Sequence, residues 1–238
     1  MSNKIYDQGM NGKNLEKLNT VSSSRQTQEH IFWAGRRDGS PRIMFVGNSI
    51  TFHGPKEEIG WSGAWGMAAS AREKDYVHLV MKIVQNQHPD AAFCIVQAAE
   101  WERTYTEADY DRLFGEAVNF APDVICCCIS ANIPAEKFEK VAFKKNLKKL
   151  HRYLCRGNAN TKIIQTSSFF DNEEKNIAIK EYTEEEGARF VYISDIIRDK
   201  ENLAFDSFDH KGIQMHPGDK GMEILAERIC KALTVVLA

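Results

Sequence analysis

The sequence has no apolar run long enough to cross a membrane, no excess charge of either sign and no familiar metal or nucleotide motif. A membrane-spanning helix needs roughly 18 apolar residues, and no stretch approaches that length. Lys plus Arg number 31 against 33 for Asp plus Glu, so the net charge of −2 gives no general attraction to nucleic acid or anionic membranes. Because neither a C-x-x-C pair nor a glycine-rich phosphate fingerprint occurs, we expect no metal and no cofactor.

The N-terminus is polar and lacks the apolar core of a signal peptide, which favours a cytoplasmic location. Six cysteines fit that compartment, since most fall in predicted strands, where a cysteine is usually a small buried hydrophobe. Residues 1–41 are predicted to form an N-terminal arm, with Ile31-Phe32-Trp33 as an anchor on the body. Residues 42–238 are predicted to form one domain.

Strand-like and helix-like segments alternate through that domain, which favours an α/β fold with a parallel sheet and covering helices. The patterns predict strands near 42–48, 92–98, 123–130, 161–167 and 189–194. They predict helices near 64–72, 75–87, 108–120, 135–155, 173–187 and 217–236.

The most informative segment is the short apolar run Ile43–Val46, which is followed by Gly47-Asn48-Ser49. The run predicts a buried strand that ends at the glycine, so Ser49 is expected at the sheet edge where ligands bind. A serine hydroxyl needs a base before it can act as a nucleophile. His216, which precedes Pro217 ahead of the last predicted helix, is the candidate base. A strand-end serine that only caps a turn is the alternative.

With their neighbours, Ser49 and His216 resemble the SGNH (GDSL-type) hydrolase family. Gly47-Asn48-Ser49 is similar to the family's Gly-Asp-Ser block, and His216 matches the catalytic histidine ahead of the terminal helix. The resemblance implies a flavodoxin-like three-layer α/β/α fold with a five-stranded parallel sheet in the order 2-1-3-4-5. It also implies an oxyanion hole made by the N–H of Ser49, an N–H of Ala98 or Ala99 (the latter preferred) and the amide of Asn132.

The chain departs from the family pattern in three of its blocks. Glycines are missing from the second block and from the third, where Ser130 stands, and Ile213 replaces the aspartate of the last block. That aspartate normally fixes the tautomer of the histidine. Either an acid such as Asp209 folds back to give a relocated triad, or a main-chain carbonyl accepts the bond. We favour the second arrangement, a Ser-His dyad.

Further candidate substrate contacts are Asn48, His53, Trp61, Glu100 and Trp101. Flat aromatic faces suit sugar rings, although large aromatic residues also fill cores. Glu102, on the other side of Trp101, is the alternative to Glu100 as an acid that faces the pocket. A solvated carboxylate is the simpler interpretation of either glutamate, and a structural hydrogen bond is the simpler interpretation of His53.

These residues together predict a serine esterase that hydrolyses a small acyl ester, with an O-acetylated carbohydrate as one candidate substrate. A glycan- or metabolite-binding protein without activity is the alternative that Ile213 and the missing glycines favour. A thioesterase or lysophospholipase would keep the same catalytic residues and change the acyl pocket. The rate should rise with increasing pH, with an apparent pKa near that of an ordinary histidine, about 6.5, because attack needs the neutral ring.

Overall fold

A mixed six-stranded sheet forms the centre of the computed structural model, which describes residues 30–36 and 38–237. The strand order is β1-β3-β2-β4-β5-β6, in which β2 to β6 are parallel and β1 is antiparallel to β3. The strands are β1 (Ile31–Gly35), β2 (Arg42–Gly47), β3 (Ala92–Gln97), β4 (Val124–Cys128), β5 (Lys162–Thr166) and β6 (Arg189–Val191). When the parallel strands β2 to β6 are counted from one in chain order, they lie in the order 2-1-3-4-5. The prediction of a purely parallel five-stranded sheet was wrong, because β1 adds a sixth, antiparallel strand at the edge.

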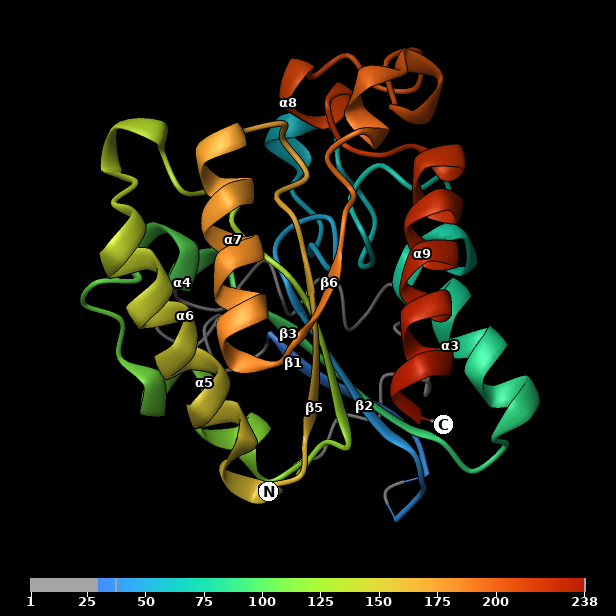
Figure 1. Cartoon of the computed structure of the whole chain (residues 1–238). Helices are drawn as coiled ribbons and strands as arrows, with labels where there is room; N and C mark the ends of the chain where they lie inside the picture. The colour runs from blue at the N-terminus through green and yellow to red at the C-terminus, as the bar shows by residue number, and fades with distance from the viewer. Residues whose placement is uncertain (1–29, 37, 238) are drawn as a thin grey trace.

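Helices cover both faces of this sheet and make the α/β/α sandwich seen in Figure 1. One face carries α3 (Tyr76–Gln87) and α9 (Asp219–Leu237), and the other carries α5 (Tyr110–Val118), α6 (Lys140–Leu154) and α7 (Glu173–Glu186). Two short helices, α4 (Ala99–Thr104) and α8 (Lys211–Gln214), were not predicted. Single 3-10 turns lie at Glu57–Ile59, Arg72–Lys74, Ala135–Lys137, Cys155–Gly157, Ile196–Arg198 and Lys200–Asn202. In the described part of the chain, no helix is both long and apolar enough to cross a bilayer.

The central strands serve two cores because successive side chains of a strand point to opposite faces. Ile43 and Phe45 of β2 pack into the core beneath α3 and α9, whereas Met44 and Val46 pack beneath α5, α6 and α7. All four side chains are fully buried. A strand covered on both faces reads as a continuous apolar run, which is why this segment was clear in the sequence.

The edge strand β1 lies inside the segment that was predicted to be an arm. Its Phe32 is buried and its ring lies 4.2 Å from the ring of Phe52, which closes the turn after β2. The predicted anchor of Ile31-Phe32-Trp33 is thus a strand of the sheet. The rest of the predicted arm, residues 1–29, lies outside the described residues.

The helix predicted near 64–72 does not form. The segment instead bonds to its surroundings: the N–H of Met67 donates to the carbonyl of Ser49 at 2.8 Å, and the N–H of Gly66 donates to the buried carboxylate of Asp75 at 2.8 Å. Ala68 has a φ of 78°, which no helix accommodates. These tertiary bonds outweigh the local helical pattern and leave a loop beside Ser49.

The register of the sheet brings three strand ends together. Gly47 at the end of β2 lies opposite Gln97 of β3 on one side and opposite Cys128 of β4 on the other. The loops that follow these three strands therefore meet at one edge of the sheet, and the first of them carries Ser49.

The contact between β1 and the Ser49 turn predicts that Phe32→Ala lowers the free energy of unfolding by about 3 to 5 kcal/mol, as for other buried phenylalanines. Urea denaturation measures the change. Ile83→Ala is the matched control, because this side chain on α3 is 41% exposed and its loss should change stability by less than about 0.5 kcal/mol. Equal effects of the two substitutions would contradict a structural role for β1.

Candidate active site

The turn after β2 presents Ser49 at the sheet edge. The N–H groups of Thr51 and Phe52 both donate to the carbonyl of Asn48, at 2.9 and 3.0 Å, which closes the turn. Gly47 is required before it, since a Cβ there would collide with the side chain of Thr51 and with the carbonyl of Cys128. The turn leaves Ser49 half-buried.

The structure brings Ser49 and His216 together across 167 residues of sequence. The distance from Ser49 Oγ to His216 Nε2 is 2.7 Å, which is a hydrogen bond. The histidine is held through its backbone, because its N–H donates to the carbonyl of Ile213 and its carbonyl accepts from the N–H of Ala204. The pair has the geometry of a nucleophile and its base.

The other ring nitrogen of His216 bonds to the main chain. His216 Nδ1 lies 2.8 Å from the carbonyl oxygen of Gly212. A carbonyl can only accept, so Nδ1 carries the proton and Nε2 is left with a lone pair for the Ser49 hydroxyl. Among the described residues this carbonyl occupies the place of an orienting carboxylate, and Asp209 does not contact the ring.

Ile213, which stands where the family has its aspartate, is fully buried. It packs in a small apolar cluster with Trp61, Met67, Ala68 and Ala204. The side chain therefore anchors the short helix α8, whose residue Gly212 supplies the carbonyl acceptor for the His216 ring.

The surroundings of His216 favour its neutral form. Burial lowers the pKa of His216 to about 4, the bond to Gly212 opposes that change, and the nearby His53 and His210 lower the pKa further. Burial also lowers the pKa of His53, which bonds its own neighbour Gly54 at 2.5 Å. His53 thus lies near the dyad as predicted from its position, in a structural hydrogen bond.

Asn132 lies on the loop after β4, and a buried carboxylate holds it there. Glu102 of α4 is fully buried and accepts bonds from the Asn132 backbone N–H at 3.0 Å and from its side-chain Nδ2 at 2.5 Å. The same carboxylate accepts from the N–H of Ser130 at 2.5 Å. One hydrogen of the Asn132 amide is thereby fixed, and the second remains available at the half-buried edge.

Ser130, which stands where the resembled third block has a glycine, has a backbone conformation that favours glycine. Its φ is 95°, in the region that L side chains rarely adopt. Its hydroxyl is buried without a hydrogen-bond partner among the described residues. A serine is therefore held here in a conformation that a glycine would adopt at lower cost.

Asn48 is a structural residue, which corrects its prediction as a substrate contact. It is buried, its Nδ2 donates to Glu102 at 2.9 Å, and its Oδ1 accepts from the N–H of Ile50 at 3.1 Å. An aspartate at position 48 would place a second carboxylate against Glu102 in the protein interior.

Ala99 is a poor candidate for the oxyanion donor in this structure, contrary to the prediction. Its N–H already donates to the side chain of Gln97 at 2.9 Å, and the N–H of Ala98 donates to the carbonyl of Gly47 at 2.5 Å. The first bond is local, and the second joins the end of β3 to the end of β2.

The remaining predicted contacts take other roles in the structure. Trp101 is fully buried in the second core and donates its indole N–H to Tyr110. Trp61 is 2% exposed and donates its indole N–H to the carbonyl of His53. The two aromatic rings therefore fill cores, which corrects their prediction as contacts. Glu100 is partly exposed and pairs with Arg112 on the surface.

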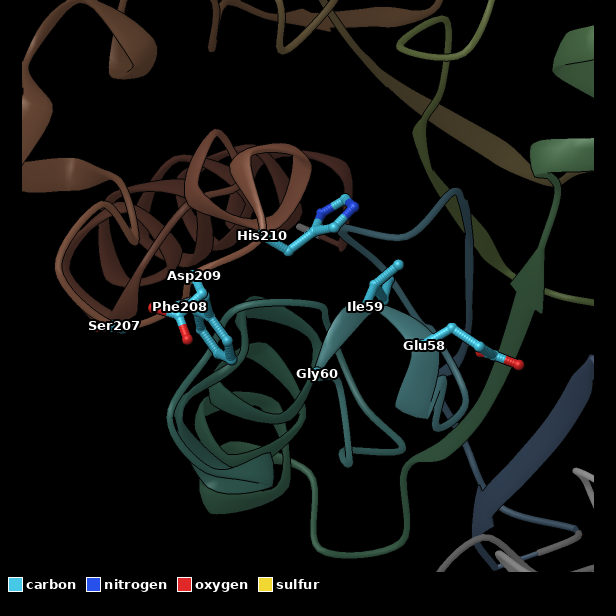
Figure 2. Close-up of a pocket in the computed structure, with 7 residues that line it drawn as sticks. All are labelled: Glu58, Ile59, Gly60, Ser207, Phe208, Asp209 and His210. Atoms are coloured by element: carbon cyan, nitrogen blue, oxygen red, sulfur yellow. The ribbon is translucent and has the colours of Figure 1, made fainter.

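A pocket of about 480 Å³ lies next to the start of α8, where His210 lines it, and is drawn in Figure 2. Two loops line it, with Glu58, Ile59 and Gly60 from one and Ser207, Phe208, Asp209 and His210 from the other. Asp209, the candidate orienting acid, is therefore a pocket residue. In the described residues no three or more His, Cys, Asp or Glu side chains group as metal ligands do.

Two groups of the site were not predicted from the sequence. The Gly212 carbonyl has no side-chain signature, and the buried Lys175 looks like an ordinary solvated charge. Glu102 was considered, from its position after the second parallel strand, only as an alternative to Glu100 for an acid that faces the pocket, and its burial was not predicted.

Neither a protein-family model nor a curated protein sequence matches the chain. Among solved structures, the psychrotrophic esterase EstA from Pseudoalteromonas sp. matches with a TM-score of 0.57 and 14% identity, over 83% of this chain and 99% of its own. A two-domain esterase active on acetylated mannans matches with a TM-score of 0.55 and 15% identity, over 82% of this chain and 49% of its own. A family two carbohydrate esterase from Cellvibrio japonicus matches with a TM-score of 0.52 and 15% identity, over 83% of this chain and 62% of its own.

The chain therefore spans about half of the two-domain esterase and less than two thirds of the Cellvibrio enzyme. At such low identity the likeness shows the fold alone. The chain shares the α/β/α fold of these esterases, which agrees with the three-layer fold that the resemblance around Ser49 and His216 implied.

The strained backbone at Ser130 predicts that Ser130→Gly raises the free energy of unfolding by about 1 kcal/mol. Relief of a left-handed conformation contributes about 1 to 2 kcal/mol, and the greater freedom of unfolded glycine opposes it by about 0.4 to 1 kcal/mol. Ser130→Ala is the control that removes the unpaired hydroxyl and keeps the Cβ. Urea denaturation should find the glycine variant more stable than the alanine variant, and the reverse order would refute the strain.

Proposed function

We propose that the protein is a serine ester hydrolase with Ser49 as nucleophile and His216 as general base. The observation that carries the proposal is the 2.7 Å separation of Ser49 Oγ and His216 Nε2, together with the bond from Nδ1 to the Gly212 carbonyl. The esterase descriptions of its structural neighbours agree with this chemistry.

In the proposed mechanism Ser49 Oγ attacks the ester carbonyl carbon while its proton passes to His216 Nε2. The tetrahedral intermediate then collapses, the bond to the leaving oxygen breaks, and Nε2 returns the proton to that oxygen to release the alcohol. Water next attacks the acyl-serine and gives a proton to Nε2. The second collapse releases the acid and returns the proton to Ser49.

The developing oxyanion would accept bonds from the N–H of Ser49 and from the second hydrogen of the Asn132 amide. One such side-chain donor is worth about 3 to 4 kcal/mol of transition-state stabilisation. The dyad lacks a carboxylate to stabilise the imidazolium, so the fixed donors and the Gly212 carbonyl carry a larger share of the catalysis than in a full triad.

For the substrate we propose a small acyl ester of a carbohydrate. The pocket of Figure 2 reaches the start of α8, because its His210 accepts a bond from the N–H of Ile213, whose own carbonyl accepts from the N–H of His216. Its lining combines carboxylates, which accept bonds from sugar hydroxyls, with the ring of Phe208, which suits a sugar face. The neighbouring two-domain esterase is active on acetylated mannans, which is consistent with such a substrate.

The proposal predicts that a fluorophosphonate probe labels the protein and that p-nitrophenyl acetate is hydrolysed, faster than the octanoate. Ser49→Ala should abolish labelling and reduce turnover to background, because its hydroxyl is the acyl acceptor. His216→Ala should lose a comparable factor, and the double variant little more, since the two groups act as one unit.

Matched controls separate chemistry from folding. Ser62→Ala and His88→Ala change exposed residues and should retain wild-type turnover. Asp209→Asn should remain within a few-fold of wild type, because the Gly212 carbonyl orients the ring, whereas loss of the orienting carboxylate of a serine protease costs about ten-thousand-fold. A folded wild-type protein that neither labels nor turns over would contradict the esterase proposal and favour the binding-protein alternative.

The lowered pKa of His216 predicts the pH dependence. Attack needs the neutral ring, and burial moves the pKa to about 4, below the ordinary value of about 6.5. kcat/KM should therefore stay on its plateau from pH 8 to about pH 5.5 and fall only as the pH drops through the lowered pKa. Circular dichroism across the range controls for acid unfolding. An acidic limb centred at about 6.5 or above would contradict the buried, carboxylate-free environment.

A further inference from the structure

Glu102 stands between the two halves of the candidate site. It is fully buried at the first turns of α4, and four N–H donors point at its two oxygens. Asn48 Nδ2 and the Ser130 N–H bind Oε1, at 2.9 and 2.5 Å, and the Asn132 backbone N–H and Nδ2 bind Oε2, at 3.0 and 2.5 Å. The first donor adjoins Ser49, and the other three belong to the loop that carries the oxyanion asparagine.

The same loop is held from its other side by a buried ammonium. Lys175 of α7 is 5% exposed, and its Nζ donates to the carbonyl oxygens of Ser130 at 3.2 Å and Ile133 at 2.5 Å. The loop 130–133 thus has N–H groups bound to a carboxylate and carbonyl groups bound to a cation. Each buried charge is satisfied by groups of the opposite polarity, as buried charges require.

Burial raises the pKa of Glu102, and the hydrogen bonds from Asn48, Asn132 and Ser130 oppose that change. All four of its partners among the described residues are donors, and this geometry favours a carboxylate without a proton, because a protonated oxygen would find no acceptor among them. Bonds to a charged acceptor are shorter and stronger than neutral ones. They also fix the Asn132 amide, since Nδ2 rather than Oδ1 must face Glu102. The second hydrogen of Nδ2 is then directed away from Glu102.

We propose that Glu102 is a positioning residue that couples the Ser49 turn to the Asn132 loop, with Lys175 as the opposing charge. This clamp of Glu102 and Lys175 rests on the proposed function, and it explains two departures from the family blocks. Asn48 supplies a donor where an aspartate would repel Glu102, and the bonds to Ser130 hold a non-glycine residue in a glycine conformation.

The test compares Glu102→Gln with Asn48→Asp and with the double variant. Glutamine turns an amide NH₂ toward N–H donors, so kcat should fall by about 10- to 100-fold while KM changes less than about threefold, as expected for a small misplacement of catalytic groups. Asn48→Asp alone places two carboxylates together and should fall at least as far. In the double variant the new amide at position 102 donates to the new carboxylate at position 48, and its oxygen still accepts from Asn132, so that only the bond from the Ser130 N–H is not restored. The kcat of the double variant should therefore exceed that of either single variant.

Two further readouts keep the clamp separate from the esterase proposal. Hydrogen exchange at the Ser130 and Asn132 amides should quicken by about tenfold or more in Glu102→Gln, while amides of α6 stay as in wild type. Urea midpoints should fall in both single variants and recover in the double variant. Glu100→Gln, two residues away on the same helix, is the matched control and should change none of these.

If the wild-type protein has no esterase activity but the variants show these exchange and urea effects, the esterase proposal is wrong and the clamp is supported. Unchanged exchange at Ser130 and Asn132 in Glu102→Gln, or a double variant no better than the worse single variant, would overturn the clamp.

Discussion

The hydrogen bond between the His216 ring and the carbonyl oxygen of Gly212 decides what the site can do. It assigns the proton to Nδ1 and leaves Nε2 facing the Ser49 hydroxyl. Ile213 is buried in an apolar cluster and anchors the short helix α8, which carries that carbonyl. Apolar packing therefore places a backbone carbonyl where it fixes the tautomer of the His216 ring, which a carboxylate does in a full triad. A neutral acceptor stabilises imidazolium less than a carboxylate, which agrees with the lowered pKa of His216.

The second constraint is charge buried beneath the site. Glu102 and Lys175 bind opposite polarities of one loop, so the strand end after β4 is held in place although it lacks the family's glycine. With Asn48 as donor, the same carboxylate reaches the Ser49 turn. Asn48 and Ser130, which both depart from the resembled blocks, thus belong to one set of hydrogen bonds around Glu102.

Sequence reasoning reached the parts that follow from local pattern and from strand-end geometry. The apolar run of β2 and the turn at Gly47 located Ser49, and the histidine ahead of the last helix located its partner. The helix expected near 64–72 failed because tertiary bonds to Ser49 and Asp75 override local propensity. Trp61 and Trp101 were placed in the site because an aromatic residue near a strand end looks the same whether it faces solvent or the core. The burial of Glu102 was not predicted for the related reason that burial of a charge depends on donors far away in the sequence.

The most direct test of the central claim is the tautomer of the His216 ring, read from the nitrogen-15 chemical shifts of its two ring nitrogens near neutral pH. The proposed dyad requires a protonated Nδ1, bonded to the Gly212 carbonyl, and an unprotonated Nε2 that shifts when Ser49 is replaced by alanine. A ring protonated on Nε2, or an Nε2 signal indifferent to that replacement, would contradict the account.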